Sequence, residues 1–229
     1  MRAACRCRPG CRHDLPIAVE ARRRGLAVIG DIELFALAAR SPVVAVTGSN
    51  GKSTVTTLAS KMLESQGLRA PAGGNLGPPA LDLLNDEADA YVLEISSFQM
   101  ETTDSLAPLA ATVLNVSADH LDRHGTLELY AELKEKLLKA AEHAVCQRRR
   151  SARRGDGRAS PARRAVLGAS GAYARLFDRD VGFKVEGRAL ARTRHETAAS
   201  CRGLGLSGTH NEANALAALA LTEPLTTKT

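Results

Sequence analysis

Aromatic residues are nearly missing from this chain: its 229 residues include no Trp, three Tyr and four Phe. The core must therefore be built from Ala, Val and Leu, and an apolar fraction of 44% is sufficient for a real core. No apolar run reaches about 18 residues, the length that argues for a membrane span. Residues 1–12 are rich in Arg and Cys but contain no apolar stretch, so we expect no secretory signal there.

Cysteine is also scarce. The five Cys are an odd number, and Cys5, Cys7 and Cys11 crowd at the N-terminus, which argues against a disulfide framework in a chain of this size. Three Cys without a fourth nearby are weak evidence for a metal site. The pattern favours a reduced protein of the cytoplasm.

Positive charge is sparse in the middle of the chain, although the net charge is +6. Residues 43–146 carry seven Lys or Arg and fourteen Asp or Glu, so we expect no nucleic-acid partner. Eight arginines instead fall within residues 147–164, among Ala, Ser and Gly. This composition is typical of a solvated or poorly folded segment.

The most informative pattern is Val-Val-Ala-Val-Thr-Gly-Ser-Asn-Gly-Lys-Ser-Thr at residues 43–54. It predicts a buried strand that leads through a glycine-rich turn to a helix N-terminus, where backbone N–H groups can hold phosphate. Gly48 and Gly51 let the backbone approach an anion, and Lys52 supplies a charge for the terminal phosphates. The hydroxyl of Ser53 or Thr54 can ligate Mg²⁺.

This loop is shorter than the common P-loop. In the common pattern a glycine stands five positions before the Gly of Gly-Lys, and here that position is Val46. The alternative interpretation is an ordinary strand-turn-helix with an exposed lysine. The preceding strand, both glycines, the lysine and the paired hydroxyls together favour the phosphate site.

Strands and helices alternate across the middle of the chain. The predicted elements are strands at 43–47, 90–95 and 110–116 and helices at 52–65, 80–84 and 127–141. Such alternation predicts an α/β fold with a mostly parallel sheet and helices on both faces. Ligands of such sheets bind beyond the carboxyl ends of the strands.

Acidic and histidine residues follow two of these strands. Glu94 ends the apolar run Tyr-Val-Leu-Glu and needs a partner there; Mg²⁺ held between a carboxylate and phosphates would satisfy it. The alternative is an edge acid in a salt bridge. After the next strand, one residue of Asp119, His120, Asp122 and His124 can join the same ion cluster, although a lone His is usually structural.

Five segments occur in the order seen in Mur ligases, and the chain resembles that family. They are residues 47–54, Gly-Gly-Asn-Leu-Gly at 73–77, Leu-Glu-Ile-Ser-Ser-Phe-Gln-Met-Glu-Thr-Thr at 93–103, Leu-Asn-Val-Ser-Ala-Asp-His-Leu-Asp-Arg at 114–123, and 206–216. The Ser-Ser-Phe-Gln string resembles the branch that adds D-glutamate to UDP-N-acetylmuramoyl-L-alanine. It argues against the alternatives, a folylpolyglutamate synthase or another Mur ligase.

The resemblance implies an ATP-dependent, amide-forming ligase of peptidoglycan synthesis. The carboxylate of UDP-N-acetylmuramoyl-L-alanine would take the γ-phosphoryl group of ATP to give an acyl phosphate, which the amine of D-glutamate attacks. Such chemistry depends on positioning and charge neutralisation. The expected partners are these small molecules and Mg²⁺, with the protein a monomer in the cytoplasm, bound neither to a membrane nor to nucleic acid.

The resemblance also implies residue roles. The ATP phosphates would lie on Gly48, Ser49, Asn50, Gly51, Lys52, Ser53 and Thr54. Asn211 and Asn214 would approach the adenine side, and Asn75 would contact the muramoyl substrate or the phosphoryl group. The Mg²⁺ ligands would be Ser53, Glu94, His120 and a carbamylated Lys134, with Lys52, His120 and Lys134 catalytic and His120 also near the substrate. From the residues alone, Lys134 is one of several surface lysines.

Departures from the family pattern concern the domains. Mur ligases of this branch have three; here we expect residues 1–40 to be a remnant of the first, residues 41–229 to be the central ATP-binding domain, and the third to be absent. Similarity is weak over 147–203, which we expect to be divergent or poorly ordered, through a frameshift or an insert. The alternative function is a noncatalytic ATP-binding remnant.

Overall fold

The structure is a computed structural model of the chain. It describes residues 4–6, 15–117, 121–147, 173–176, 182–186, 189–192, 196–200 and 209–226. Cys7, Cys11 and, apart from Gln147, the Arg-rich segment 147–164 lie outside the described residues, as does His120.

A nine-stranded sheet runs through the described residues in the order β11-β10-β9-β8-β7-β6-β3-β5-β4. Its parallel part consists of β7 (His143–Gln147), β6 (Ala110–Val113), β3 (Val43–Thr47), β5 (Tyr91–Glu94) and β4 (Ala72–Gly74). In the centre, Val44 pairs with Val92 on one side and with Ala110 on the other. The predicted parallel α/β sheet is confirmed, and the carboxyl ends of these strands share one edge.

Four antiparallel strands extend the sheet beyond β7. They are β8 (Tyr173–Leu176), β9 (Gly182–Glu186), β10 (Ala189–Arg192) and β11 (Glu196–Ser200). The sequence does not predict β10 and β11, because together they contain one β-branched residue, and β-branched side chains are typical of strands.

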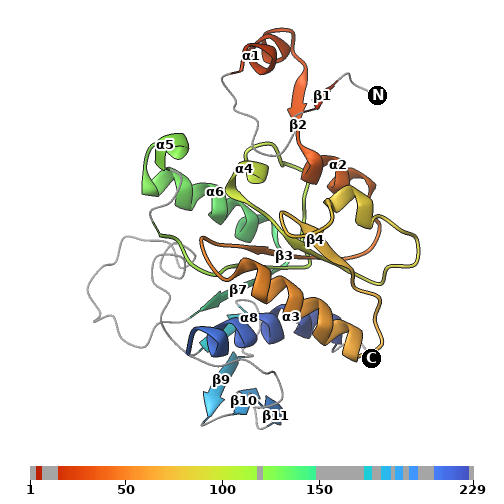
Figure 1. Ribbon diagram of the computed structural model, residues 1–229, viewed down its shortest axis with the longest axis vertical. Helices are drawn as coiled ribbons and strands as arrows, with labels where there is room; N and C mark the ends of the chain where they lie inside the picture. The colour runs from red at the N-terminus through yellow and green to blue at the C-terminus, as the bar shows by residue number, and fades with distance from the viewer. Residues whose placement is uncertain are drawn as a thin grey trace.

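Helices cover both faces of the parallel strands (Figure 1). On one face, α3 (Lys52–Ser65) packs along α8 (Thr209–Thr226). The opposite face is covered by α2 (Asp31–Ala38), the 3₁₀ helix η1 (Ala80–Leu83), α4 (Ser97–Met100) and α6 (Leu127–Ala140). The helices expected at 52–65 and 127–141 are therefore present with nearly the predicted bounds.

Strand β3 shows why its sequence is apolar without alternation. All five of its residues are buried. Val44 and Val46 pack in the cluster beneath α3 and α8, whereas Val43 and Ala45 pack in the cluster on the other face. A central parallel strand covered on both sides is therefore almost continuously apolar, with Thr47 as the polar residue at its end.

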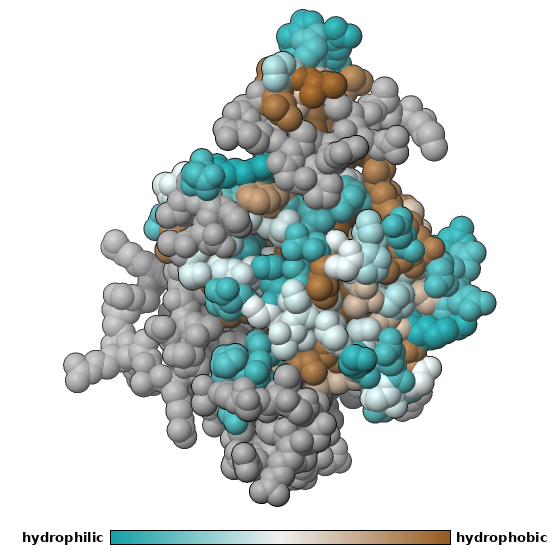
Figure 2. Space-filling model, viewed as in Figure 1, coloured by the Kyte–Doolittle hydropathy of each residue, from teal (hydrophilic) through white to brown (hydrophobic). Residues whose placement is uncertain are grey.

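A small unit precedes α2 and projects from the body at the top of Figure 1. In it, β1 (Ala4–Arg6) pairs in parallel with β2 (Ala27–Ile29), and α1 (Pro16–Arg23) lies beside them. Ile17 and Val19 of α1 are 68% and 52% exposed, and hydrophobic surface gathers over α1 in Figure 2. No helix in the described part of the chain has the length and apolar character of a membrane span.

Candidate active site

The loop between β3 and α3 is shaped by two glycines. Gly48 has φ 153°, and a Cβ there would lie 3.1 Å from the Cβ of Leu114 at the end of β6. Gly51 has φ 84°, and a Cβ there would lie 2.9 Å from Asn214 Oδ1 of α8. Larger residues would therefore meet neighbouring elements as well as backbone strain.

The first turn of α3 presents backbone N–H groups to one point beyond the sheet edge. The first helical bond back to the loop is from Val55 N to Gly51 O, at 3.0 Å. The N–H groups of Lys52, Ser53 and Thr54 have no acceptor among the described residues, as expected for a helix start. Together with the helix dipole they form a site for an anion.

Lys52 lies across its own loop. Its Nζ donates to Gly48 O at 2.9 Å and to Ser49 O at 3.1 Å. Both acceptors are neutral carbonyls, so an anionic phosphate oxygen is a stronger partner for the ammonium group. The lysine can exchange these bonds for a phosphate without leaving the loop.

The carboxylate of Glu94 is held at the end of β5 by neutral donors. Ser53 Oγ donates to its Oε2 at 2.8 Å, and Asn75 Nδ2 donates to its Oε1 at 2.7 Å. Glu94 is 2% exposed, and among the described residues no Lys, Arg or His pairs with it. β5 also lies between β3 and β4, so Glu94 is not the salt-bridged edge acid that the sequence allowed.

These oxygens fit a hard cation. Mg²⁺ prefers carboxylate and hydroxyl oxygens beside phosphates, and Glu94 and Ser53 supply both types next to the anion site. Of the two hydroxyls left open by the sequence, that of Ser53 is the one bonded to Glu94. Within the described ranges no three His, Cys, Asp or Glu gather as a ready-made metal cluster; His120 lies outside those ranges.

Lys134 is buried beneath the loop, so the expectation of a surface lysine is wrong. It is 1% exposed, and its Nζ donates to Thr47 Oγ1 at 3.3 Å and to Gly48 O at 3.2 Å. The Nζ also lies 4.5 Å from the ring centroid of Tyr130. Tyr130 and Lys134 lie on α6 one turn apart, which aims both toward the loop.

Helix α8 carries both predicted asparagines and brings Asn214 to the loop. Asn214 lies against Gly51, and its Nδ2 donates to Asn211 Oδ1 at 3.4 Å. The residues predicted to hold the ATP phosphates form the loop between β3 and α3 and the start of α3, and Lys134 and Asn214 contact it. Asn75 is linked to it through Glu94, and Asn211 through Asn214.

Comparison with known proteins decides the family. The model of the Mur ligase middle domain matches residues 46–222. The chain belongs to the Mur ligase family. It is 43% identical to the UDP-N-acetylmuramoylalanine--D-glutamate ligase of Pseudomonas putida over 93% of the chain, and 44% identical to that of Haemophilus influenzae over 94%. These alignments cover 46% and 48% of the relatives, so the chain spans about half their length.

Solved Mur ligases share the fold at lower identity. The UDP-N-acetylmuramate-alanine ligase of Thermotoga maritima superposes with a TM-score of 0.54 at 20% identity, covering 97% of this chain and 51% of that one. The MurF ligase of Thermotoga maritima in complex with ADP gives a TM-score of 0.53 at 18% identity, covering 99% and 61%. The central-domain fold expected for a Mur ligase is confirmed.

Two residues of this Mur ligase site were not predicted from the sequence. Asn115 follows β6 and bonds the loop: its Oδ1 accepts from Asn50 N at 2.8 Å and from Ser49 N at 3.1 Å. The hydroxyl of Tyr130 lies 3.3 Å from Ser49 Oγ. Asn115 could have been found, because it is among the first polar residues after a buried parallel strand. The Tyr130 contact depends on how α6 packs, which the sequence does not specify.

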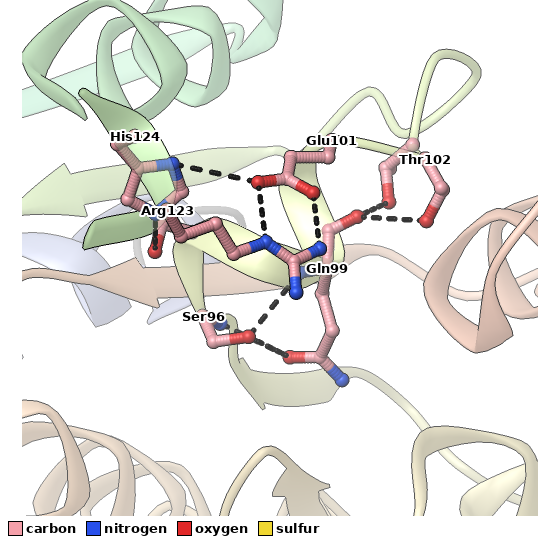
Figure 3. Close-up of polar contacts among 8 residues, drawn as sticks. Ser96, Gln99, Glu101, Thr102, Arg123 and His124 are labelled. Carbon is pink, nitrogen blue, oxygen red and sulfur yellow. Dashed lines mark hydrogen bonds and ion pairs between the residues drawn. The ribbon is translucent and has the colours of Figure 1, made fainter. Parts of the chain in front are cut away.

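A second polar cluster fixes α5 (Leu121–His124) against α4 (Figure 3). Arg123 Nε and Nη2 donate to Glu101 Oε1 and Oε2 at 3.1 and 2.5 Å, and both side chains are largely buried. His124 Nδ1 lies 3.4 Å from Glu101 Oε1, and its Nε2 lies 3.0 Å from Ser97 Oγ. His124, one of four candidates for the ion cluster, is thus partnered within this Mur ligase framework rather than beside Glu94.

Residues of the Ser-Ser-Phe-Gln string start α4 and tie it to α2. Ser96 and Gln99 form a reciprocal capping box, in which Ser96 Oγ accepts from Gln99 N and Gln99 Oε1 accepts from Ser96 N. Gln99 Nε2 also donates to Asp31 Oδ2 at 2.9 Å. Ser96 and Gln99 of this string therefore stabilise the start of α4, and Gln99 also stabilises its contact with α2.

Proposed function

We propose that this chain binds Mg·ATP and carries the phosphoryl-transfer part of a ligase that adds D-glutamate to UDP-N-acetylmuramoyl-L-alanine through an acyl phosphate. The observation that carries the proposal is the buried Glu94, which is held by Ser53 next to Lys52 and to the N–H groups of the α3 start, for which the described part of the chain supplies no acceptor. The relatives named for this D-glutamate ligase support the choice of substrates.

Each residue group would act by charge or by position. The N–H groups at the start of α3 and the ammonium of Lys52 would hold the phosphates and offset their charge. Glu94 and Ser53 would hold Mg²⁺, which when bound supplies further charge neutralisation at the phosphates. Asn75, already on Glu94, would contact the muramoyl substrate or the phosphoryl group.

The remaining roles rest on the family resemblance. His120 would be a Mg²⁺ ligand near the substrate, and Asn211 and Asn214 would approach the adenine side of ATP. Carbamylation would turn Lys134 into an anionic ligand for Mg²⁺; its burial next to Gly48 O supports a place near the phosphates. We propose a monomer that acts in the cytoplasm without nucleic acid, which agrees with the acidic middle of the chain.

The function is tested by two measurements on the whole chain. Calorimetry with ATP and Mg²⁺ measures binding, and phosphate release with UDP-N-acetylmuramoyl-L-alanine and D-glutamate measures turnover. Binding that depends on Mg²⁺ supports the nucleotide site, and its absence refutes it. Binding without release would favour the second candidate, a noncatalytic nucleotide-binding protein, and release would favour the ligase.

Ser53→Ala is expected to raise the Mg²⁺ concentration needed for half-maximal ATP binding. The variant loses a hydroxyl that bonds Glu94, and a hydrogen bond to a charged group contributes about 1.5–3 kcal/mol, so we expect a rise of about tenfold or more. A Mg²⁺ titration of ATP binding measures it. Ser65→Ala, at the exposed end of the same helix, is the control. An equal Mg²⁺ requirement in both variants would contradict the assignment of Ser53.

A further inference from the structure

The short loop is held in shape from outside. Val46, at the position of the missing glycine, is a fully buried residue of β3, so the turn is confined to residues 48–51 before α3 begins. The backbone N–H groups of Ser49 and Asn50, in its first half, are bonded to the chain that leaves β6. Asn115 accepts from both, and Ser117 N donates to Ser49 Oγ at 3.1 Å.

Asn115 uses both ends of its side-chain amide. Its Oδ1 accepts from Asn50 N at 2.8 Å and from Ser49 N at 3.1 Å, and its Nδ2 donates to Asn50 O at 2.9 Å. Its main-chain carbonyl accepts from Ser49 N as well, at 3.0 Å. Only a carboxamide can accept and donate in this way, because aspartate is an acceptor alone when ionised.

These bonds divide the loop into two halves with different tasks. The N–H groups of Ser49 and Asn50 already donate to Asn115 Oδ1, so they are not available to bind a phosphate. Those of Lys52, Ser53 and Thr54 have no acceptor among the described residues. Of the seven residues predicted to hold phosphate, Ser49 and Asn50 are thus held by Asn115, whereas Lys52, Ser53 and Thr54 can bind the anion.

We propose that Asn115 is a positioning residue of the nucleotide site, which clamps the first half of the shortened loop so that the N–H groups at the α3 start converge on phosphate. The inference rests on the proposed function for its effect on ATP. The clamp itself is a property of the chain without nucleotide, and it can be measured separately.

Amide hydrogen exchange tests the clamp in the unmodified chain. Without nucleotide, the Asn50 N–H should exchange slowly, whereas those of Lys52 and Ser53 should exchange fast. Addition of Mg·ADP should slow exchange at Lys52 and Ser53 and leave Asn50 unchanged. Fast exchange at Asn50 in the chain without nucleotide would overturn the clamp.

Variants of Asn115 test the role of the side chain. In Asn115→Ala, the Asn50 amide should lose its protection, while Ser49 keeps part of its own because the main-chain carbonyl of residue 115 remains. Loss of these bonds should weaken Mg·ATP binding about tenfold, with the melting temperature little changed. Asn115→Asp, which keeps the acceptor, should restore protection at Asn50. Asn85→Ala is the control, because Asn85 Oδ1 also caps a loop N–H, that of Glu87, before β5 begins.

The outcomes separate the two proposals. Equal ATP affinity in Asn115→Ala and the unmodified chain would overturn the positioning role, and so would equal weakening in Asn85→Ala. If the unmodified chain binds no nucleotide, the proposed function fails, and exchange at Asn50 still decides the clamp. If Asn115→Ala does not fold, Asn115→Asp and the unmodified chain supply the exchange test.

Discussion

Lys52→Ala is expected to weaken Mg·ATP binding by about 10- to 100-fold, the loss that corresponds to one hydrogen bond between charged groups. In the structure the ammonium group is bonded to Gly48 O and Ser49 O, beside the N–H groups of the α3 start. Because the ammonium group lies next to the anion site and is bonded to neutral carbonyls, a bound phosphate would gain a favourable interaction with its positive charge. Calorimetry with ATP and Mg²⁺ measures the loss.

The control for Lys52→Ala is Lys61→Ala, an exposed lysine on the same helix. It removes the same charge from α3 at a distance from the loop, so it separates a local effect from a change in net charge. Lys52→Ala should also unfold at a urea concentration close to that of the unmodified chain, because it loses only bonds between Lys52 and its own loop. Equal ATP affinity in the two variants would refute the assignment of Lys52.

Phe35→Ala is expected to lower the free energy of unfolding by about 3–5 kcal/mol, the usual effect of removing a buried aromatic ring. Phe35 of α2 is fully buried and packs edge-to-face on Tyr91 of β5, with ring centroids 5.1 Å apart. Since a domain is stable by about 5–15 kcal/mol, this change is a large part of the total. Urea unfolding followed by circular dichroism measures it.

Leu37→Ala is the matched control for Phe35→Ala. Leu37 lies on the same helix but is 66% exposed, so the change should be within about 0.5 kcal/mol. The contrast tests whether α2 is part of the central core. If Phe35→Ala were as stable as Leu37→Ala, α2 would not pack on β5 as described.

The sequence predicts the parallel sheet and the loop because their signals are local. A strand such as Val43–Thr47 is almost continuously apolar because both of its faces are covered, and the glycine-lysine turn follows it directly. The ends of parallel strands share an edge, so Glu94 could be placed next to the loop before its bonds to Ser53 and Asn75 were seen.

What the sequence could not predict depends on packing between distant segments. The burial of Lys134 follows from the way α6 lies on the sheet, and neither its spacing nor its neighbours distinguish it from the half-exposed Lys136. The bonds from Asn115 to the loop require a meeting of the β3 and β6 ends at hydrogen-bond distance. The antiparallel strands β10 and β11 lack the alternation of strand formers that would reveal them.

Because Gly51 contacts Asn214, the nucleotide site can be completed only after α8 has folded onto the loop. Helix α8 lies late in the sequence, yet its apolar residues complete the cluster beneath β3 and its Asn214 closes on the loop. During synthesis from the N-terminus, β3 and α3 emerge long before α8 can dock on them. A nascent chain would therefore leave part of one face of its central strands uncovered until α8 has been synthesised, and nucleotide could stabilise the site only after that helix is in place.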